Sequence, residues 1–129
     1  MKLRIRDNSI RLRLSQTEVE ALDGQGSISS KIAFTGGAAL VYEIESSPAC
    51  VAPTATFEDD RISIRLPSSS VEAWAATEQI SIRDEQSLSS GEKLSILVEK
   101  DFACPKPREG EDESDMFPNP NVKLVEKNY

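Results

Sequence analysis

Apolar and charged residues alternate at the start of the chain, in "KLRIR" (2–6) and in "SIRLRL" (9–14). This period of two predicts two β-strands that each bury one face. The residues between them, Asp7 and Asn8, tolerate turn conformations, so the two segments should form a β-hairpin.

A helix and a second hairpin should follow. Ser15 and Glu18 have the spacing of a capping box, which predicts a short helix of about two turns that ends at Leu22. Strands near 27–34 and 39–45 then flank the turn sequence "TGG". The predicted order of this part of the chain is β-β-α-β-β.

The same order recurs in the second part of the chain. Residues 7–22 align with residues 59–74 at an offset of 52, and seven of the sixteen positions are identical. Ile28 meets Ile80 at this offset, and a gap of two residues follows. The matching order and spacing predict an internal duplication.

The second copy differs in detail from the first. Pro67 and the serines after it are expected to start its helix, and Ser69 and Glu72 repeat the capping-box spacing. Strands near 79–83 and 93–99 then flank "QSLSSG".

An isolated unit of about 45 residues buries too little surface to be stable. The two repeats, 1–53 and 54–104, should therefore pack against each other about a pseudo-two-fold axis. The predicted fold is α+β and mainly antiparallel, one domain (1–104) with a barrel-like or sandwich-like sheet. Residues 105–129 form an acidic, proline-containing tail that we expect to fold back on the domain. The core candidates are Leu3, Ile5, Ile10, Leu12, Leu14, Val19, Leu22, Ile28, Tyr42, Ile44, Ile62, Ile64, Leu66, Val71, Trp74, Ile80, Ile82, Ile96 and Val98.

Charge is distributed unevenly over the 129 residues. The formal net charge is −7, yet residues 1–13 carry five bases and one acid. The acidic balance argues against nucleic acid as a partner, because phosphate repulsion opposes approach. The start of the chain has no apolar signal region, and no apolar run is long enough to cross a bilayer. We therefore expect a cytoplasmic protein that does not bind membranes.

Several kinds of catalytic site are missing from the sequence. The chain has no histidine, the usual acid–base side chain at neutral pH, and no Walker-type phosphate loop or GxSxG motif. The acids at 58–60 fall in a predicted hairpin turn, where they are expected to be solvated. The sequence predicts no cofactor and favours a protein that is not an enzyme.

The basic N-terminal hairpin is one candidate site. Lys2, Arg4 and Arg6 share one side of the first predicted strand, and Arg11 and Arg13 share one side of the second. Arginine forks suit phosphate or carboxylate, so this surface could bind an anion. The repeat mate of Arg13, Arg65, would add a symmetric position. The alternative interpretation is a solvated face or a charged edge that prevents aggregation.

The C-terminal tail is a second candidate. Its acidic residues are Glu109, Glu111, Asp112, Glu113 and Asp115. We expect them to meet the basic hairpin, with Phe117 docked in a pocket. Oxygen ligands also suit a hard cation, which makes Glu111, Asp112, Glu113 and Asp115 candidate metal ligands, although the EF-hand loop pattern is missing.

The two cysteines are equivalent in the alignment of the repeats, since "ACVAP" with Cys50 pairs with "ACPKP" with Cys104. In a cytosolic protein both are expected to be reduced. They are either two small buried thiols or a thiol pair with a redox or soft-metal role.

Two segments carry a resemblance to a known family. The opening "MKLRIRDNSIRLRLSQTEV" and the stretch "ILVEKDFACPKPREGEDESDMFPNP" resemble a family of small bacterial proteins of unknown function. The resemblance implies a bacterial source and a tail that is a regular part of the protein. It implies no activity and no site residues.

Three functions stay open at this stage. The first is a non-catalytic binding or interaction module with an unknown protein partner. A homodimer, in which the partner is a second copy of the chain, is one form of this hypothesis. The second is a protein that binds a small anionic ligand or a metal ion through the basic hairpin or the tail. The third is a histidine-free enzyme in which an acid converges with Arg13 and Arg65.

Overall fold

The structure, a computed structural model, describes residues 1–103 and 113–119. These residues form eight β-strands, two α-helices and one 3-10 turn. No helix among the described residues is long and apolar enough to cross a membrane. The elements are β1 (Lys2–Arg6), β2 (Ser9–Leu14), α1 (Gln16–Gln25), β3 (Ser27–Ala33), η1 (Thr35–Gly37), β4 (Ala39–Ser47), β5 (Thr54–Glu58), β6 (Arg61–Pro67), α2 (Ser68–Ala76), β7 (Ser81–Ser87) and β8 (Lys93–Lys100). The order is β-β-α-β-β in each half of the chain, as the sequence predicted.

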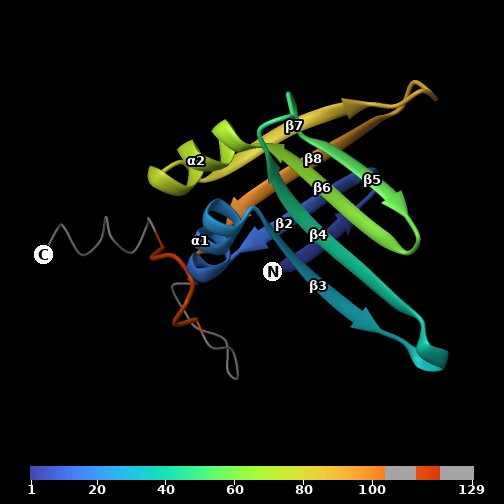
Figure 1. Cartoon of the computed structure of the whole chain (residues 1–129), viewed down its shortest axis with the longest axis horizontal. Helices are drawn as coiled ribbons and strands as arrows, with labels where there is room; N and C mark the ends of the chain where they lie inside the picture. Colours follow the sequence, from blue (N-terminus) through green and yellow to red (C-terminus); the bar gives the residue numbers. More distant parts are fainter. Residues whose placement is uncertain (104–112, 120–129) are drawn as a thin grey trace, which may run out of the picture.

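The strands form two four-stranded sheets in a sandwich-like arrangement (Figure 1). The first sheet has the order β1-β2-β8-β7 and the second has the order β3-β4-β6-β5. Each sheet therefore combines one hairpin from each half of the chain. The hairpins join through parallel pairs, β2 with β8 and β4 with β6, so the sheets are mixed rather than purely antiparallel. Periodicity could not show this, because it does not specify which strands become neighbours.

The strand registers of the two sheets correspond to one another. Leu3 lies opposite Leu12 in β1–β2, and Ala55 lies opposite Ile64 in β5–β6, which is 52 residues later for both partners. If each strand of the first sheet is replaced by its equivalent from the other half of the chain, the strand order becomes that of the second sheet. The architecture has the pseudo-two-fold symmetry that a duplication would produce, while the duplication itself stays a prediction.

The registers also correct the alignment between α2 and β7. Ile28 lies opposite Ile44, and Ile82 lies opposite Val98, so the structural equivalent of Ile28 is Ile82 and not Ile80. The gap of two residues therefore lies before β7, in the connection that contains Ile80. This displacement explains why Ile80 is 50% exposed and does not belong to the core.

The core lies between the two sheets and beneath the helices. Its buried residues were all core candidates: Leu12, Leu14, Val19, Leu22, Ile44, Ile64, Leu66, Val71, Trp74, Ile82, Ile96 and Val98. Leu3, Ile10, Ile28, Tyr42 and Ile62 pack against them and are partly buried. Besides Ile80, one candidate is wrong: Ile5, which is 60% exposed because it lies on the edge strand β1, next to the turn that joins β1 and β2.

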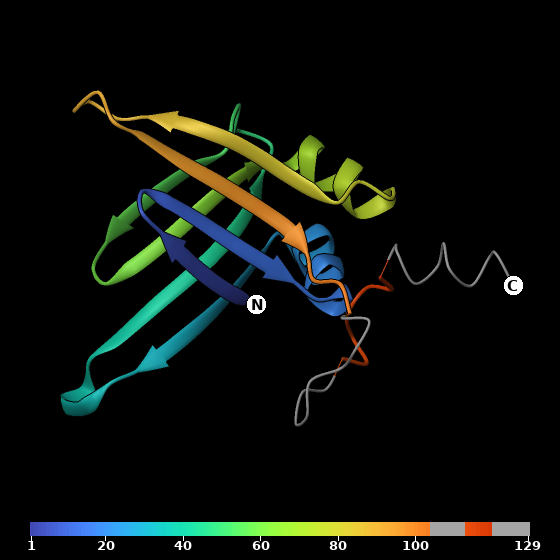
Figure 2. The same cartoon turned by 180° about the vertical axis from the view of Figure 1, so that it is seen from behind.

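The two helices lie next to each other at one end of the sandwich (Figures 1 and 2). Helix α1 begins with the predicted capping box of Ser15 and Glu18, and it ends at Gly26, whose φ of 90° forms a left-handed cap. Helix α2 lacks a capping box. Pro67 occupies its N-cap position, so Ser69 lies inside the first turn and cannot act as the cap.

Residues 113–119 pack against the N-terminal end of α1. The backbone N–H of Gln16 donates to the carbonyl of Asp115 at 2.9 Å, and the Thr17 hydroxyl donates to the Asp115 carboxylate at 2.8 Å. Phe117 forms a bridge with Phe102 and packs against the core. The described part of the tail is therefore integrated into the fold.

Candidate anion-binding site

The candidate site is the outer face of the first sheet. Alternation along the strands directs Leu12, Leu14 and Val98 inward, where they are buried. The residues between them face away from the second sheet. We call this surface the arginine face and define it by Arg4, Arg6, Arg11, Arg13 and Arg83.

One of these arginines comes from the other half of the chain. Cross-strand pairing places Arg4 next to Arg11, Arg11 next to Leu97, and Leu97 next to Arg83. Sequence analysis missed Arg83, because its position beside the N-terminal hairpin depends on the β2–β8 pairing. The alignment of the repeats gave no signal for it, since the equivalent residue in β3 is Ser29.

Part of the positive charge on this face is balanced. Glu99 lies between two arginines: its Oε1 atom accepts from Arg11 Nε at 2.7 Å and from Arg13 Nε at 2.6 Å. Lys2 Nζ lies 3.0 Å from Asp101, and Lys93 Nζ lies 3.6 Å from Glu85. Glu99 therefore holds Arg11 and Arg13 in place and leaves their charge only partly compensated.

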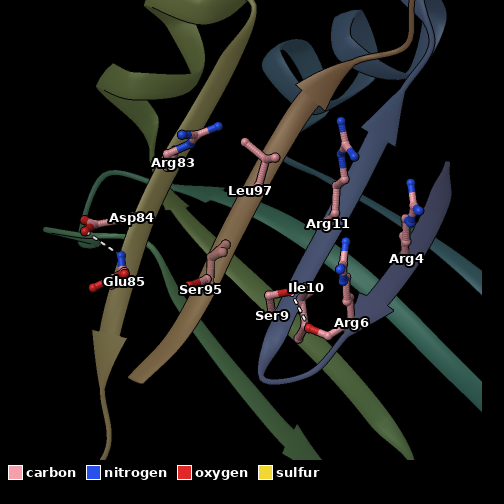
Figure 3. A pocket seen from close by; sticks show the side chains of 11 residues that line it. Arg4, Arg6, Ser9, Ile10, Arg11, Arg83, Asp84, Glu85, Ser95 and Leu97 are labelled. Carbon is pink, nitrogen blue, oxygen red and sulfur yellow. Dashed lines mark hydrogen bonds between the residues drawn. The ribbon is translucent and has the colours of Figure 1, made fainter. Parts of the chain in front are cut away.

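The other three arginines of this face differ from Arg11 and Arg13 in their pairing. Within residues 1–103 and 113–119, Arg4, Arg6 and Arg83 form no salt bridge. We call them the unpaired arginines. They line a groove of about 410 Å³ that crosses the four strands. Figure 3 shows Arg4, Arg6 and Arg11 together on two neighbouring strands, with Arg83 on the far side of Leu97.

The groove has a floor of mixed polarity and one acidic rim. Ser9 and Ser95 lie side by side across β2 and β8, and Leu97 lies between Arg11 and Arg83. The Ser9 hydroxyl donates to the Arg6 carbonyl at 2.5 Å. Asp84 and Glu85 lie at the β7 side, where Asp84 accepts a hydrogen bond from the Glu85 backbone N–H at 2.8 Å. The groove is therefore strongly cationic at the β1–β2 side and mixed in charge at the β7 side.

Arg65 does not join this cluster. It lies in β6, opposite Thr54 and Glu45, on the outer face of the second sheet. Its guanidinium lies 3.5 Å from Glu45. Arg13 and Arg65 are related by the internal symmetry, and this symmetry places them on opposite faces of the sandwich. The converging pair that the enzyme hypothesis required is therefore not formed.

The acidic tail and the cysteines add little to the candidate site. Glu111, Asp112 and Cys104 lie outside the described residues, so the metal and thiol-pair hypotheses stay predictions. In the part of the chain that the structure describes, no group of three metal-ligating side chains is present. The Asp115 carboxylate contacts the first turn of α1, and the Cys50 thiol contacts the carbonyl of Ala52 at 3.0 Å.

Comparison with known proteins identifies a family. A family model described as a family of unknown function (DUF7009) matches residues 1–121, so the chain belongs to that family. This confirms the resemblance to a family of unknown function. No curated protein and no solved structure matches the chain.

Proposed function

We propose that this DUF7009 protein is a non-catalytic binding module that holds a multiply charged anionic partner on the arginine face. The partner would occupy the groove between the unpaired arginines Arg4, Arg6 and Arg83. Arginine forks form two parallel hydrogen bonds with phosphate or carboxylate, so three of them favour a ligand with several negative groups. We also propose that the protein is bacterial and cytoplasmic and that its two halves arose by an internal duplication.

The observation that carries the proposal is a difference between the two sheets. Because their registers correspond, each position on the arginine face has an equivalent on the outer face of the second sheet. The equivalents of the unpaired arginines are Thr56, Glu58 and Ser29. At these three positions, the same fold therefore carries cations on one face and neutral or acidic residues on the other. A general need for solubility would not favour this difference, since both faces are exposed to solvent.

The total charges of the two faces show the same contrast. The described outer strand positions of the first sheet hold seven cations and two carboxylates: Lys2, Arg4, Arg6, Arg11, Arg13, Arg83 and Lys93 against Glu85 and Glu99. Those of the second sheet hold three of each: Lys31, Arg61 and Arg65 against Glu43, Glu45 and Glu58. Two of the three cations on the second sheet are paired, Arg61 with Glu43 and Arg65 with Glu45.

The overall charge of −7 restricts the partner. A long polyanion would be repelled by the rest of the protein, whereas a short anionic segment can contact the arginine face alone. Binding should weaken as salt is added, because exposed charges are screened over about 10 Å at 0.1 M ionic strength. This favours a compact multivalent anion over DNA or RNA.

The proposal can be tested with inorganic tripolyphosphate as a probe. We expect amide resonances of β1, β2 and β7 to shift on titration, and the double variant R4E/R6E to abolish the shifts. The control is K31E, which reverses one charge on the second sheet; it is compared with the single variant R4E, which makes the same change of −2 on the arginine face, and it should leave binding unchanged. Equal loss of binding in the control, or shifts that do not map to the arginine face, would overturn the proposal.

A further inference from the structure

We infer that the free edge of β1 accepts an extended peptide in which acidic and apolar residues alternate. The peptide would add to the first sheet as a fifth strand next to β1. This inference rests on the proposed function, since the arginine face supplies the charge that the peptide recognises, and it specifies the chemical class of the partner. Main-chain hydrogen bonds would provide affinity, and the alternating side chains would provide specificity.

Strand β1 bonds to β2 through only half of its backbone polar groups. Arg6 and Ser9 flank the two-residue turn between β1 and β2, so they form the hydrogen-bonded pair that closes the hairpin. Every second residue then bonds to β2, and the N–H and C=O groups of Leu3 and Ile5 point away from it. Among the described residues, these groups have no backbone partner.

The equivalent edge strand β5 has one backbone contact that β1 lacks. The backbone N–H of Ala55, the equivalent of Leu3, donates to the Gln86 side chain on β7 at 2.8 Å. The equivalent of Gln86 is Ile32, which has no side-chain acceptor and is 43% exposed.

A contact between the N-terminal hairpin and the second sheet lies just before β1, where the Tyr42 hydroxyl donates to the Met1 carbonyl at 3.1 Å. Among the described residues, the outward-pointing backbone groups of Leu3 and Ile5 have no such contact and stay available to an added strand.

The two faces of β1 differ in chemistry. Arg4 and Arg6 lie on the outer side of the strand and belong to the unpaired arginines. Ile5 lies on the inner side and is 60% exposed, and Phe34, at the end of β3, is 58% exposed. Acidic side chains on an added strand would lie beside the arginines, while its apolar side chains would cover Ile5.

The charges on β1 have an alternative explanation as a protective device. Natural edge strands carry lysine or arginine to prevent pairing with other chains. Protection does not account for an exposed Ile5 on the same strand, nor for the difference between Ile32 and Gln86. The experiment must nevertheless separate a strand that only repels other edges from one that selects an acidic partner.

The test uses a capped synthetic peptide in which Glu and Val alternate, titrated into the full-length protein. Two comparison peptides have the same composition in separate Glu and Val blocks, or Lys in place of Glu. We expect the alternating acidic peptide alone to bind and to protect the Leu3 and Ile5 amides from hydrogen exchange. Each main-chain hydrogen bond between the peptide and β1 should contribute about 1 kcal/mol. A change that removes one or two of these bonds should therefore weaken peptide binding about tenfold.

Three variants localise the site, and two of them, I5A and F57A, form a matched pair. I32Q should weaken peptide binding, because the introduced amide can accept from the Leu3 N–H as Gln86 accepts from the Ala55 N–H. I5A should also weaken it, whereas F57A, the equivalent change on β5, should not. All three positions are more than 40% exposed in the wild type, and unchanged amide spectra would confirm that the variants fold.

The outcomes distinguish this inference from the proposed function. If tripolyphosphate binds but the alternating peptide does not protect the Leu3 and Ile5 amides, strand addition is wrong and anion binding stands. Equal binding of the block peptide would likewise show recognition by charge alone. If neither probe binds the arginine face, both proposals fail.

Discussion

Lys100 Nζ lies 5.2 Å from the centre of the Phe117 ring, a distance at which a cation is attracted to an aromatic face. The same ring contacts Phe102, with 6.0 Å between the ring centres. Lys100 is 94% buried, and its ammonium donates to the Thr77 carbonyl at 2.7 Å. Phe117 therefore joins residues 113–119 to the end of β8, next to the helices. Phe117 has a structural role that the acidic composition of the tail alone would not suggest.

Removal of the Phe117 ring should destabilise the protein. We expect F117A to lower the free energy of unfolding by about 2–4 kcal/mol, through lost burial and the lost contact with Lys100. Urea unfolding followed by Trp74 fluorescence would measure this. The control V51A changes a side chain that is 94% exposed and should alter stability by no more than about 0.5 kcal/mol. Equal stability of F117A and wild type would show that the docked segment does not contribute to the fold.

Asp115 should act as a cap for helix α1 although it lies far along the chain. Its carboxylate accepts from the Thr17 hydroxyl at 2.8 Å and lies near the positive end of the helix dipole. We expect D115A to cost about 1 kcal/mol and D115N to cost less, because Asn keeps one acceptor oxygen. Thermal unfolding of the two variants side by side would test the order. A larger loss for D115N than for D115A would contradict the capping role.

Glu18 should make stability depend on pH in the acid range. Burial raises the pKa of Glu18, but hydrogen bonds from the Met1 ammonium and from Ser15 outweigh it and hold the pKa below 4.5. The unfolded state therefore binds more protons, so the stabilisation present at neutral pH is lost as the pH falls below 4.5.

The isosteric variant E18Q isolates this contribution. We expect it to be less stable than wild type at pH 7 by about 1 kcal/mol, the usual cost of a lost cap, and to approach wild type in acid. Urea midpoints measured from neutral to acid pH would show the two curves converge. Parallel curves would mean that another group causes the acid sensitivity.

The turn between β5 and β6 offers a stabilising substitution. Asp59 and Asp60 have φ angles of 50° and 58°, as in a type I′ turn, where the second position favours glycine. We expect D60G to raise the free energy of unfolding by about 0.5–1 kcal/mol and D60A to lower it, because alanine has no side-chain hydrogen bond to favour a positive φ. Thermal unfolding of the pair would check both signs.

Local chemistry in the sequence was sufficient to predict the elements and the core. Alternation identified β1 and β2, the Ser15 and Glu18 spacing identified the start of α1, and every residue of the buried core was among the candidates. These features depend on neighbours along the chain, whose spacing directly sets which face is buried. Where local signals were ambiguous they failed, as for Ser69, which repeats a capping pattern without capping a helix.

Only the tertiary structure decided which strands became neighbours, and the candidate site depends on that choice. The parallel β2–β8 pair brings Arg83 and Glu99 to the N-terminal hairpin, and the same symmetry moves Arg65 to the opposite face. Pairing between distant strands is set by the burial of whole faces and not by local pattern. The sequence alone therefore determined the building blocks and their apolar faces, whereas the packing of the two halves determined which charges share a surface.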